Sequence, residues 1–274
     1  MKRHAYLILA HNEPEVLSRL VRALDDGRND IFIHWDRKSG DAPDINTEHS
    51  ALTFVEPRMN VHWGGLNMVK AEYLLFEQAH DSGPYAYYHL ISGVDLPLKS
   101  QDFIHARCDA APDVEYIAFA PATQEEIDFR TRYWHLFPEN FKNSSIIVRG
   151  VRRGALELQK CIKVRRTGIE FCKGSQWCSV TEKFVEYLLE RKDWVMKTFS
   201  HTFCPDEMFI PTLCWNSDFR SRVHCLTDEF EGCKRFIKWI DGELMPLEEA
   251  DLPAMLDSGR WFARKFTKDN AWLK

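Results

Sequence analysis

Short apolar runs that each end in a polar cluster are the feature that most restricts the fold of this chain. Such runs cover residues 6–10, 30–35, 52–55 and 85–92. Their length and their turn-forming flanks predict buried strands. Segments with helical spacing lie between them, at 15–24 and 67–80. This alternation predicts an α/β fold with a mostly parallel central sheet flanked by helices.

Local signals refine the element boundaries. Asn12 is expected near the N-cap of the first helix, and Thr181 is expected to cap a helix over 181–191. Residues 124–170 are expected to form helices and a long loop, and a helix should begin near Asp206. Further strands are predicted over 116–119, 176–180 and 235–239. With no repeat or linker in the sequence, we expect one composite domain over 1–274.

Composition excludes several classes of protein. The 274 residues are 45% hydrophobic and 28% charged, with a net charge of −5, which is ordinary for a globular protein. A nucleic-acid partner is not expected, because such proteins carry a basic domain. The eight cysteines include no C-x-x-C pair, which argues against a zinc ribbon. The first apolar run is too short to span a membrane and no signal-peptide cleavage pattern follows, so we expect a cytoplasmic protein with mostly reduced cysteines.

Polar clusters follow four of the predicted strands or turns: 11–13, 34–37, 62–65 and 92–95. Ligands of open α/β sheets bind at the carboxyl ends of the strands. The clusters therefore predict a site of nucleotide size at this edge.

The usual phosphate-binding and hydrolase motifs are absent. The sequence contains no G-x-x-x-x-G-K-[ST], G-x-G-x-x-G, G-x-S-x-G or H-E-x-x-H, and no D-x-D that would hold a divalent metal on a diphosphate. A diphosphate site without a metal needs arginine or lysine. Arg235 and the C-terminal segment 260–266, with Arg264 and Lys265, are the candidates.

Two carboxylates follow a proline at Cys204-Pro205-Asp206-Glu207. One interpretation is an acidic first helical turn, where proline is tolerated and negative charge complements the helix dipole. The other is a general base, with Glu207 facing a cleft and Asp206 supporting it. These four residues alone leave both interpretations open.

Taken in order, the motifs resemble the core-2/I-branching β-1,6-N-acetylglucosaminyltransferase family, which also includes the peptide O-xylosyltransferases. The segments that carry the resemblance are YLILAHN (6–12), IHWDRK (33–38), VHWGG (61–65), MVKA (68–71), HLISGVDLPLK (89–99), GSQW (174–177), CPDE (204–207) and FARKF (262–266). Each motif is weak alone, but the ordered set is specific. The resemblance implies a GT-A-type glycosyltransferase fold and an inverting, metal-independent reaction on a UDP-sugar, with no cofactor.

The resemblance also implies roles for individual residues. Glu207 corresponds to the catalytic base, Lys265 to a lysine that contacts the diphosphate, and Arg235 is the best match to an arginine that shares that contact. His11 and Asp36 lie where the family holds the nucleotide, and Asp95 lies near the donor sugar. Residues 1–120 would then form a nucleotide-binding half and residues 121–274 an acceptor and catalytic half.

Other site candidates each have an equally good structural explanation. Trp63 and Trp177 either stack on a sugar face or pack in the core. Arg130, Arg132 and Tyr133 either contact the acceptor or belong to a solvated helix face. Trp35 stands where relatives often have a smaller apolar residue, which would narrow the uracil pocket.

The expected reaction is transfer of a sugar, GlcNAc in our first hypothesis and xylose in the second, to a saccharide hydroxyl with a β-linkage. A resemblance to free-standing bacterial-type members suggests a glycoconjugate acceptor and peripheral association with the inner membrane face. Two alternatives remain: a non-catalytic nucleotide- or saccharide-binding protein on the same fold, and a metal-dependent hydrolase built on His11, His34, His62 and Asp36.

Overall fold

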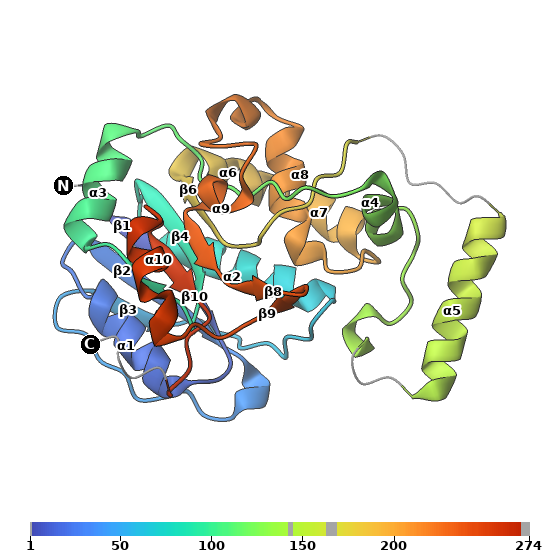
Figure 1. Ribbon diagram of the computed structural model, residues 1–274, viewed down its shortest axis with the longest axis horizontal. Coiled ribbons are helices and arrows are strands. Elements are labelled where there is room, and N and C mark those ends of the chain that lie inside the picture. The colour runs from blue at the N-terminus through green and yellow to red at the C-terminus, as the bar shows by residue number, and fades with distance from the viewer. Residues whose placement is uncertain (1, 142–144, 163–168, 270–274) are drawn as a thin grey trace.

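A five-stranded sheet forms the centre of the molecule in the computed structural model, which describes residues 2–141, 145–162 and 169–269 (Figure 1). The strand order is β3-β2-β1-β4-β6. The first four of these strands are parallel, and β6 runs antiparallel to β4. The strands are β1 (His4–Ala10), β2 (Asn29–Trp35), β3 (Ala51–Phe54), β4 (Tyr87–Ser92) and β6 (Cys178–Thr181). The predicted mostly parallel sheet is confirmed.

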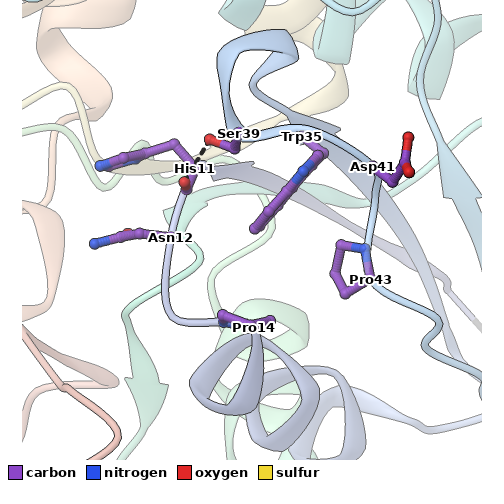
Figure 2. Close-up of a pocket in the computed structure, with 7 residues that line it drawn as sticks. All are labelled: His11, Asn12, Pro14, Trp35, Ser39, Asp41 and Pro43. Atoms are coloured by element: carbon purple, nitrogen blue, oxygen red, sulfur yellow. Dashed lines mark hydrogen bonds between the residues drawn. The ribbon is translucent and has the colours of Figure 1, made fainter.

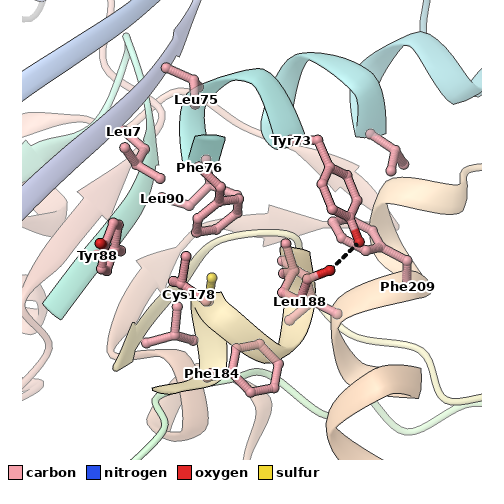
Figure 3. Close-up of a cluster of buried hydrophobic side chains, with 14 of the residues drawn as sticks. Leu7, Tyr73, Leu75, Phe76, Tyr88, Leu90, Cys178, Phe184, Leu188 and Phe209 are labelled. Carbon is pink, nitrogen blue, oxygen red and sulfur yellow. Dashed lines mark hydrogen bonds between the residues drawn. The ribbon is translucent and has the colours of Figure 1, made fainter. Parts of the chain in front are cut away.

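Two apolar layers cover the sheet, one on each face. Along β1, Ala5, Leu7 and Leu9 point into one layer, whereas Tyr6, Ile8 and Ala10 point into the other. This alternation follows from the two-residue period of a strand. Helix α2 (Leu66–Ser82) and helix α6 (Glu182–Glu190) contribute to the first layer, and helix α1 (Pro14–Leu24) contributes to the second. Figure 3 shows part of the first layer, where Phe76 of α2 and Phe184 of α6 lie on either side of Cys178.

A second, three-stranded sheet brings the C-terminal segment to the central sheet. Its order is β5-β10-β7, from β5 (Leu96–Pro97), β10 (Phe262–Arg264) and β7 (Arg235–Ile237). A separate hairpin pairs β8 (Trp239–Ile240) with β9 (Glu243–Leu244). The expectation of one strand over 235–239 is therefore wrong, because the chain leaves one sheet at Lys238 and enters another.

The remaining elements are mostly helical and short. The α-helices are α3 (Gln101–Ala110), α4 (Gln124–Thr131), α5 (Ile146–Cys161), α7 (Lys192–Phe199), α8 (Phe209–Trp215), α9 (Glu229–Cys233) and α10 (Leu252–Asp257). The 3-10 turns are η1 (Arg37–Ser39), η2 (Pro138–Asn140), η3 (Pro205–Glu207), η4 (Asp218–Arg222) and η5 (Glu249–Asp251). Helix α5 extends away from the central sheet at one end of the molecule (Figure 1).

Three local expectations differ from the structure. The N-cap of α1 is Glu13, with a φ of 52° and no side-chain cap, because Pro14 occupies the first turn and moves the boundary past Asn12. Residues 116–119 form no strand, since only isolated bridges join Glu115 to Val223 and Tyr116 to Ser179. The helix expected near Asp206 is a 3-10 turn, and the α-helix begins at Phe209.

Candidate active site

Glu207 ends the η3 turn with its carboxylate half-exposed. Its side chain is 35% exposed, and Arg130 Nη1 lies 2.7 Å from Glu207 Oε2. Arg130 Nη2 also bonds Glu126 Oε1 at 3.1 Å. The same oxygen of Glu126 accepts from Lys173 Nζ at 2.7 Å. Burial alone would lower the pKa of Arg130, but the charge and hydrogen bond of Glu207, together with the charge of Glu126 and the nearby Cys204, raise that pKa overall. The expected base therefore lies in a network of alternating charges that fixes its orientation.

Asp206, one residue earlier, points into the protein instead. Burial and then the charge of Glu207 raise the pKa of Asp206 to about 7. Glu72 of α2 is fully buried, and burial followed by the charge of Asp206 raises its pKa well above the usual range. Within the described chain, both oxygens of Glu72 and Asp206 Oδ1 are buried without a hydrogen-bond partner. Asp206 therefore lies behind the candidate base, with its carboxyl group in the interior.

A four-residue segment connects the base turn to a cationic side chain. The Gly174 N–H donates to the Glu207 carbonyl at 2.9 Å, and the guanidinium of Arg264 lies 4.2 Å from the ring centroid of Trp177. Three Cα–Cα steps span about 11 Å at most. Gly174 is required here, since a Cβ would lie 1.9 Å from the carbonyl oxygen of Ala118. Trp177 is buried and carries Arg264 over its face, so the structure favours a supporting role for it over sugar stacking.

Strand β10 brings two cations to the carboxyl ends of β1 and β4. Arg264 Nε lies 3.3 Å from Oδ1 of the fully buried Asp95, and Asp95 Oδ2 accepts from the Ser92 N–H at 3.0 Å. Burial raises the pKa of Asp95 although Arg264 opposes the shift. Burial lowers the pKa of His11, and the nearby charge of Lys265 lowers it further. Asp95, Arg264, Lys265 and His11 therefore lie near one another at one edge of the sheet.

Arg235 does not face this edge. Its side chain is fully buried and donates to the carbonyls of Cys233 and Cys178 at 2.6 and 2.9 Å. Its guanidinium also stacks on Phe262, 4.5 Å from the ring centroid. The structure thus gives Arg235 a role inside the protein, where it joins β7 to the ends of the central strands, and it does not support a diphosphate contact.

A pocket of about 430 Å³ opens beside the ends of β1 and β2 (Figure 2). The lining residues are His11, Asn12, Pro14, Trp35, Ser39, Asp41 and Pro43. Trp35 is buried, and its indole Nε1 has no hydrogen-bond partner among the described residues. Asp36 lies outside the lining and instead accepts from the N–H groups of Lys38 and Val61, at 2.9 and 3.3 Å. Asp36 therefore shapes the loop, whereas His11 and Trp35 form the wall.

The remaining candidates separate into two groups. The acceptor candidate Arg130 and the donor-sugar candidate Trp63 lie beside η3: Trp63 is half-exposed and packs edge-on against Phe203, with ring centroids 5.4 Å apart. Arg132 instead pairs with Asp128 at 2.7 Å and stacks near Tyr133 on the surface.

The sequence-based interpretation missed Glu72. Glu72 lies one residue before Tyr73 and three after Val69, on the buried side of α2. A carboxylate at a core position of an amphipathic helix was the available signal.

The structure does not assemble the residues of the hydrolase alternative. Within the described part of the chain, the side chains close enough to share a metal ion are His4, His89 and Cys108, which are all buried. None of His11, His34, His62 or Asp36 belongs to this group.

Comparison with known protein families identifies the family of this chain. A family model described as Core-2/I-Branching enzyme matches residues 4–255. The chain belongs to this family. Its fold is accordingly GT-A-like, and membership implies a glycosyltransferase with a sugar-nucleotide donor and a saccharide acceptor. The match ends before Arg264 and Lys265, and no curated protein matches the sequence. None of the described helices is long and apolar enough to cross a bilayer.

Proposed function

We propose that this family member transfers GlcNAc from UDP-GlcNAc to a saccharide hydroxyl by an inverting, metal-independent displacement that forms a β-linkage. The observation that supports it most is the 174–177 segment. The Gly174 N–H at one end of this segment bonds the backbone of Glu207, and Trp177 at the other end packs against the guanidinium of Arg264. The proposed base and a cation are therefore held by the two ends of one four-residue segment.

Glu207 is the proposed base. Arg130 occupies Oε2, and no described residue donates to Oε1, which leaves that oxygen for the acceptor hydroxyl. Oε1 would take the hydroxyl proton while the acceptor oxygen forms its bond to the anomeric carbon and the bond to UDP breaks. Inversion needs one such base, on the face opposite the leaving group.

Arg264 and Lys265 are proposed to stabilise the diphosphate as negative charge develops on it. Charges held in place before the reaction need no reorganisation, and losing one costs on the order of 100-fold in rate. Both residues lie on or just after β10, beside Asp95 and His11. The uracil is proposed to occupy the pocket formed by His11 and Trp35.

The test replaces Glu207 by glutamine, which keeps the shape and removes the base. Glu207→Gln is expected to abolish UDP release from UDP-GlcNAc, assayed without a divalent metal, while the calorimetric Kd for UDP stays within about threefold. Glu125→Gln, on the exposed side of α4, is the matched control and should keep full turnover. Normal turnover of Glu207→Gln would exclude the proposed base, and activity that disappears with EDTA would exclude metal independence.

The same assay separates the alternatives. Faster UDP release from UDP-xylose than from UDP-GlcNAc would assign the second donor. Tight UDP binding by the unmodified protein, without turnover of any donor, would favour a non-catalytic binding protein.

A further inference from the structure

Helix α5 is the part of the chain least explained by a sugar-transfer site. It projects from one end of the molecule (Figure 1), and none of its residues is buried. Its contacts with the described body include two hydrogen bonds that Gln159 exchanges with the backbone of Trp134, at 2.8 and 3.0 Å, and the Arg152 guanidinium, which lies 5.0 Å from the centroid of Phe141. A helix held in this way presents most of its surface to the surroundings.

One side of this surface is an aliphatic strip. Ile147, Val151, Leu158 and Ile162 follow each other at spacings of four, seven and four residues, which places them in one row. Their exposed fractions are 74%, 50%, 62% and 63%. Single exposed apolar residues are ordinary, but a row of large aliphatic side chains along one helix indicates an interaction surface.

A basic strip lies on the side of the helix opposite the aliphatic one. Arg149, Arg153 and Lys160 are exposed and repeat at the same spacings of four and seven. Within the described ranges Arg149 and Arg153 form no ion pair, whereas Lys160 pairs with Glu157 at 2.8 Å. With Arg152, α5 holds four basic residues and one acidic residue, a net charge of +3 in a chain whose net charge is −5.

We propose that α5 binds the surface of a membrane that contains anionic lipids. A helix with aliphatic residues on one side and arginine or lysine on the opposite side can lie in the interfacial plane, with its apolar side among the acyl chains and its basic side at the level of the headgroups. The long basic side chains reach the phosphates while their stems cover apolar surface. The acidic remainder of the chain opposes this only weakly, because charges more than about 8 Å away are screened at physiological ionic strength.

Charge and shape favour a lipid surface over a protein groove. The basic strip selects an anionic partner, and a lipid surface requires no fitted cavity for four separate aliphatic side chains. The helix also connects to the site: Phe141, under Arg152, packs 4.5 Å from Phe203, which precedes the η3 turn with Glu207. A membrane-bound α5 would therefore hold the η3 side of the molecule near the lipid surface.

Vesicle co-sedimentation of the full chain tests the proposal without any catalytic assay. The protein should bind phosphatidylcholine vesicles that contain phosphatidylglycerol, should not bind phosphatidylcholine alone, and should dissociate as salt is raised. Ile147→Ser with Leu158→Ser, and separately Arg149→Gln with Arg153→Gln, should each weaken binding by about tenfold or more. Leu256→Ser and Lys183→Gln, exposed residues on α10 and α6, are matched controls and should leave binding unchanged.

Several outcomes would overturn the proposal. Equal binding to both vesicle types would contradict a preference for anionic lipid. Loss of binding in the control variants would show that α5 is not the part of the chain responsible. Absence of vesicle binding together with a dimer in light scattering that Ile147→Ser with Leu158→Ser dissociates would show that the strip joins two copies of the chain. Thermal unfolding at the same temperature for every variant shows that a loss of vesicle binding is not caused by misfolding. UDP binding is measured in parallel and should be the same in every variant, so the lipid proposal and the proposed function are tested separately.

Discussion

Neighbouring carboxylates near the candidate base have very different environments. Glu207 is half-exposed and bonded to Arg130, while Asp206 is buried near Glu72, whose carboxylate has no hydrogen-bond partner among the described residues. The tight η3 turn points adjacent side chains in different directions, so only one of the two reaches the site. Asp206 remains in the interior, where burial raises its pKa.

The raised pKa of Asp206 predicts how stability depends on pH. Its pKa is about 7 when folded and 3.8 in the reference state, so the folded protein holds the proton more tightly. Asp206 therefore lowers the free energy of unfolding as pH rises from about 4 to about 7, and the cost persists above that range. Asp206→Asn removes this titration and should lose less stability over the same interval. Urea denaturation at several pH values measures it, and parallel profiles of the two proteins would contradict the assignment.

Trp35 is predicted to contribute to nucleotide affinity through its indole N–H. The Nε1 atom is buried beside the pocket without a described partner, and a base carbonyl would satisfy it. Trp35→Phe keeps an aromatic wall and removes the donor, so the Kd for UDP should rise about 5- to 10-fold, as expected for one hydrogen bond. Calorimetry with UDP measures this, and an unchanged Kd would place the uracil elsewhere.

At the scale of elements, Thr181 joins β6 to α6 and holds a buried acid. Its Oγ1 accepts from the Phe184 N–H at 3.3 Å and donates to Glu115 Oε1 at 2.6 Å. The sequence predicted the cap but not the second contact, because Glu115 is 66 residues away in the chain.

Thr181→Ala should lower the free energy of unfolding by about 1–3 kcal/mol, because it removes a cap and a donor to a buried carboxylate. The loss should be larger above neutral pH, because Glu115, whose pKa burial raises to about 7, is then ionised. Thr181→Ser retains the hydroxyl and should recover most of the stability in the same denaturation assay. A serine variant as unstable as the alanine variant would assign the effect to the lost methyl group.

Elements with strong local signals matched their predictions best. Strands β1 and β2 and helix α2 appear within a few residues of the expected positions, because a buried run or an amphipathic repeat is visible without any partner. Residues 116–119 have the composition of a strand but pair only at isolated bridges. Pairing depends on where neighbouring strands lie, which local sequence does not encode.

At the scale of the whole molecule, stability and surface function are divided between the central core and α5. Phe184 of α6 is fully buried in the first apolar layer (Figure 3), whereas Leu158 of α5 is mostly exposed. Phe184→Ala should therefore cost about 3–5 kcal/mol of unfolding free energy, and Leu158→Ala should change it by less than about 0.5 kcal/mol. Urea denaturation of both variants checks the contrast. A large loss from Leu158→Ala would show that α5 packs against the body more closely than the structure describes.

The sequence alone determined the parallel α/β core, the polar clusters at its strand ends and the Pro-Asp-Glu turn, since each depends on residues close together in the chain. Tertiary structure decided which charged side chains reach the site. Arg235 pairs in register with Phe262, two residues before Arg264 on the neighbouring strand, so both guanidinium groups lie on the same side of the sheet and both are buried. They differ in their partners: Arg264 lies beside Asp95, whereas Arg235 donates to the carbonyls of Cys233 and Cys178. The physical reason is that these partners come from segments far apart in the sequence, and strand register sets where along the sheet each side chain meets them.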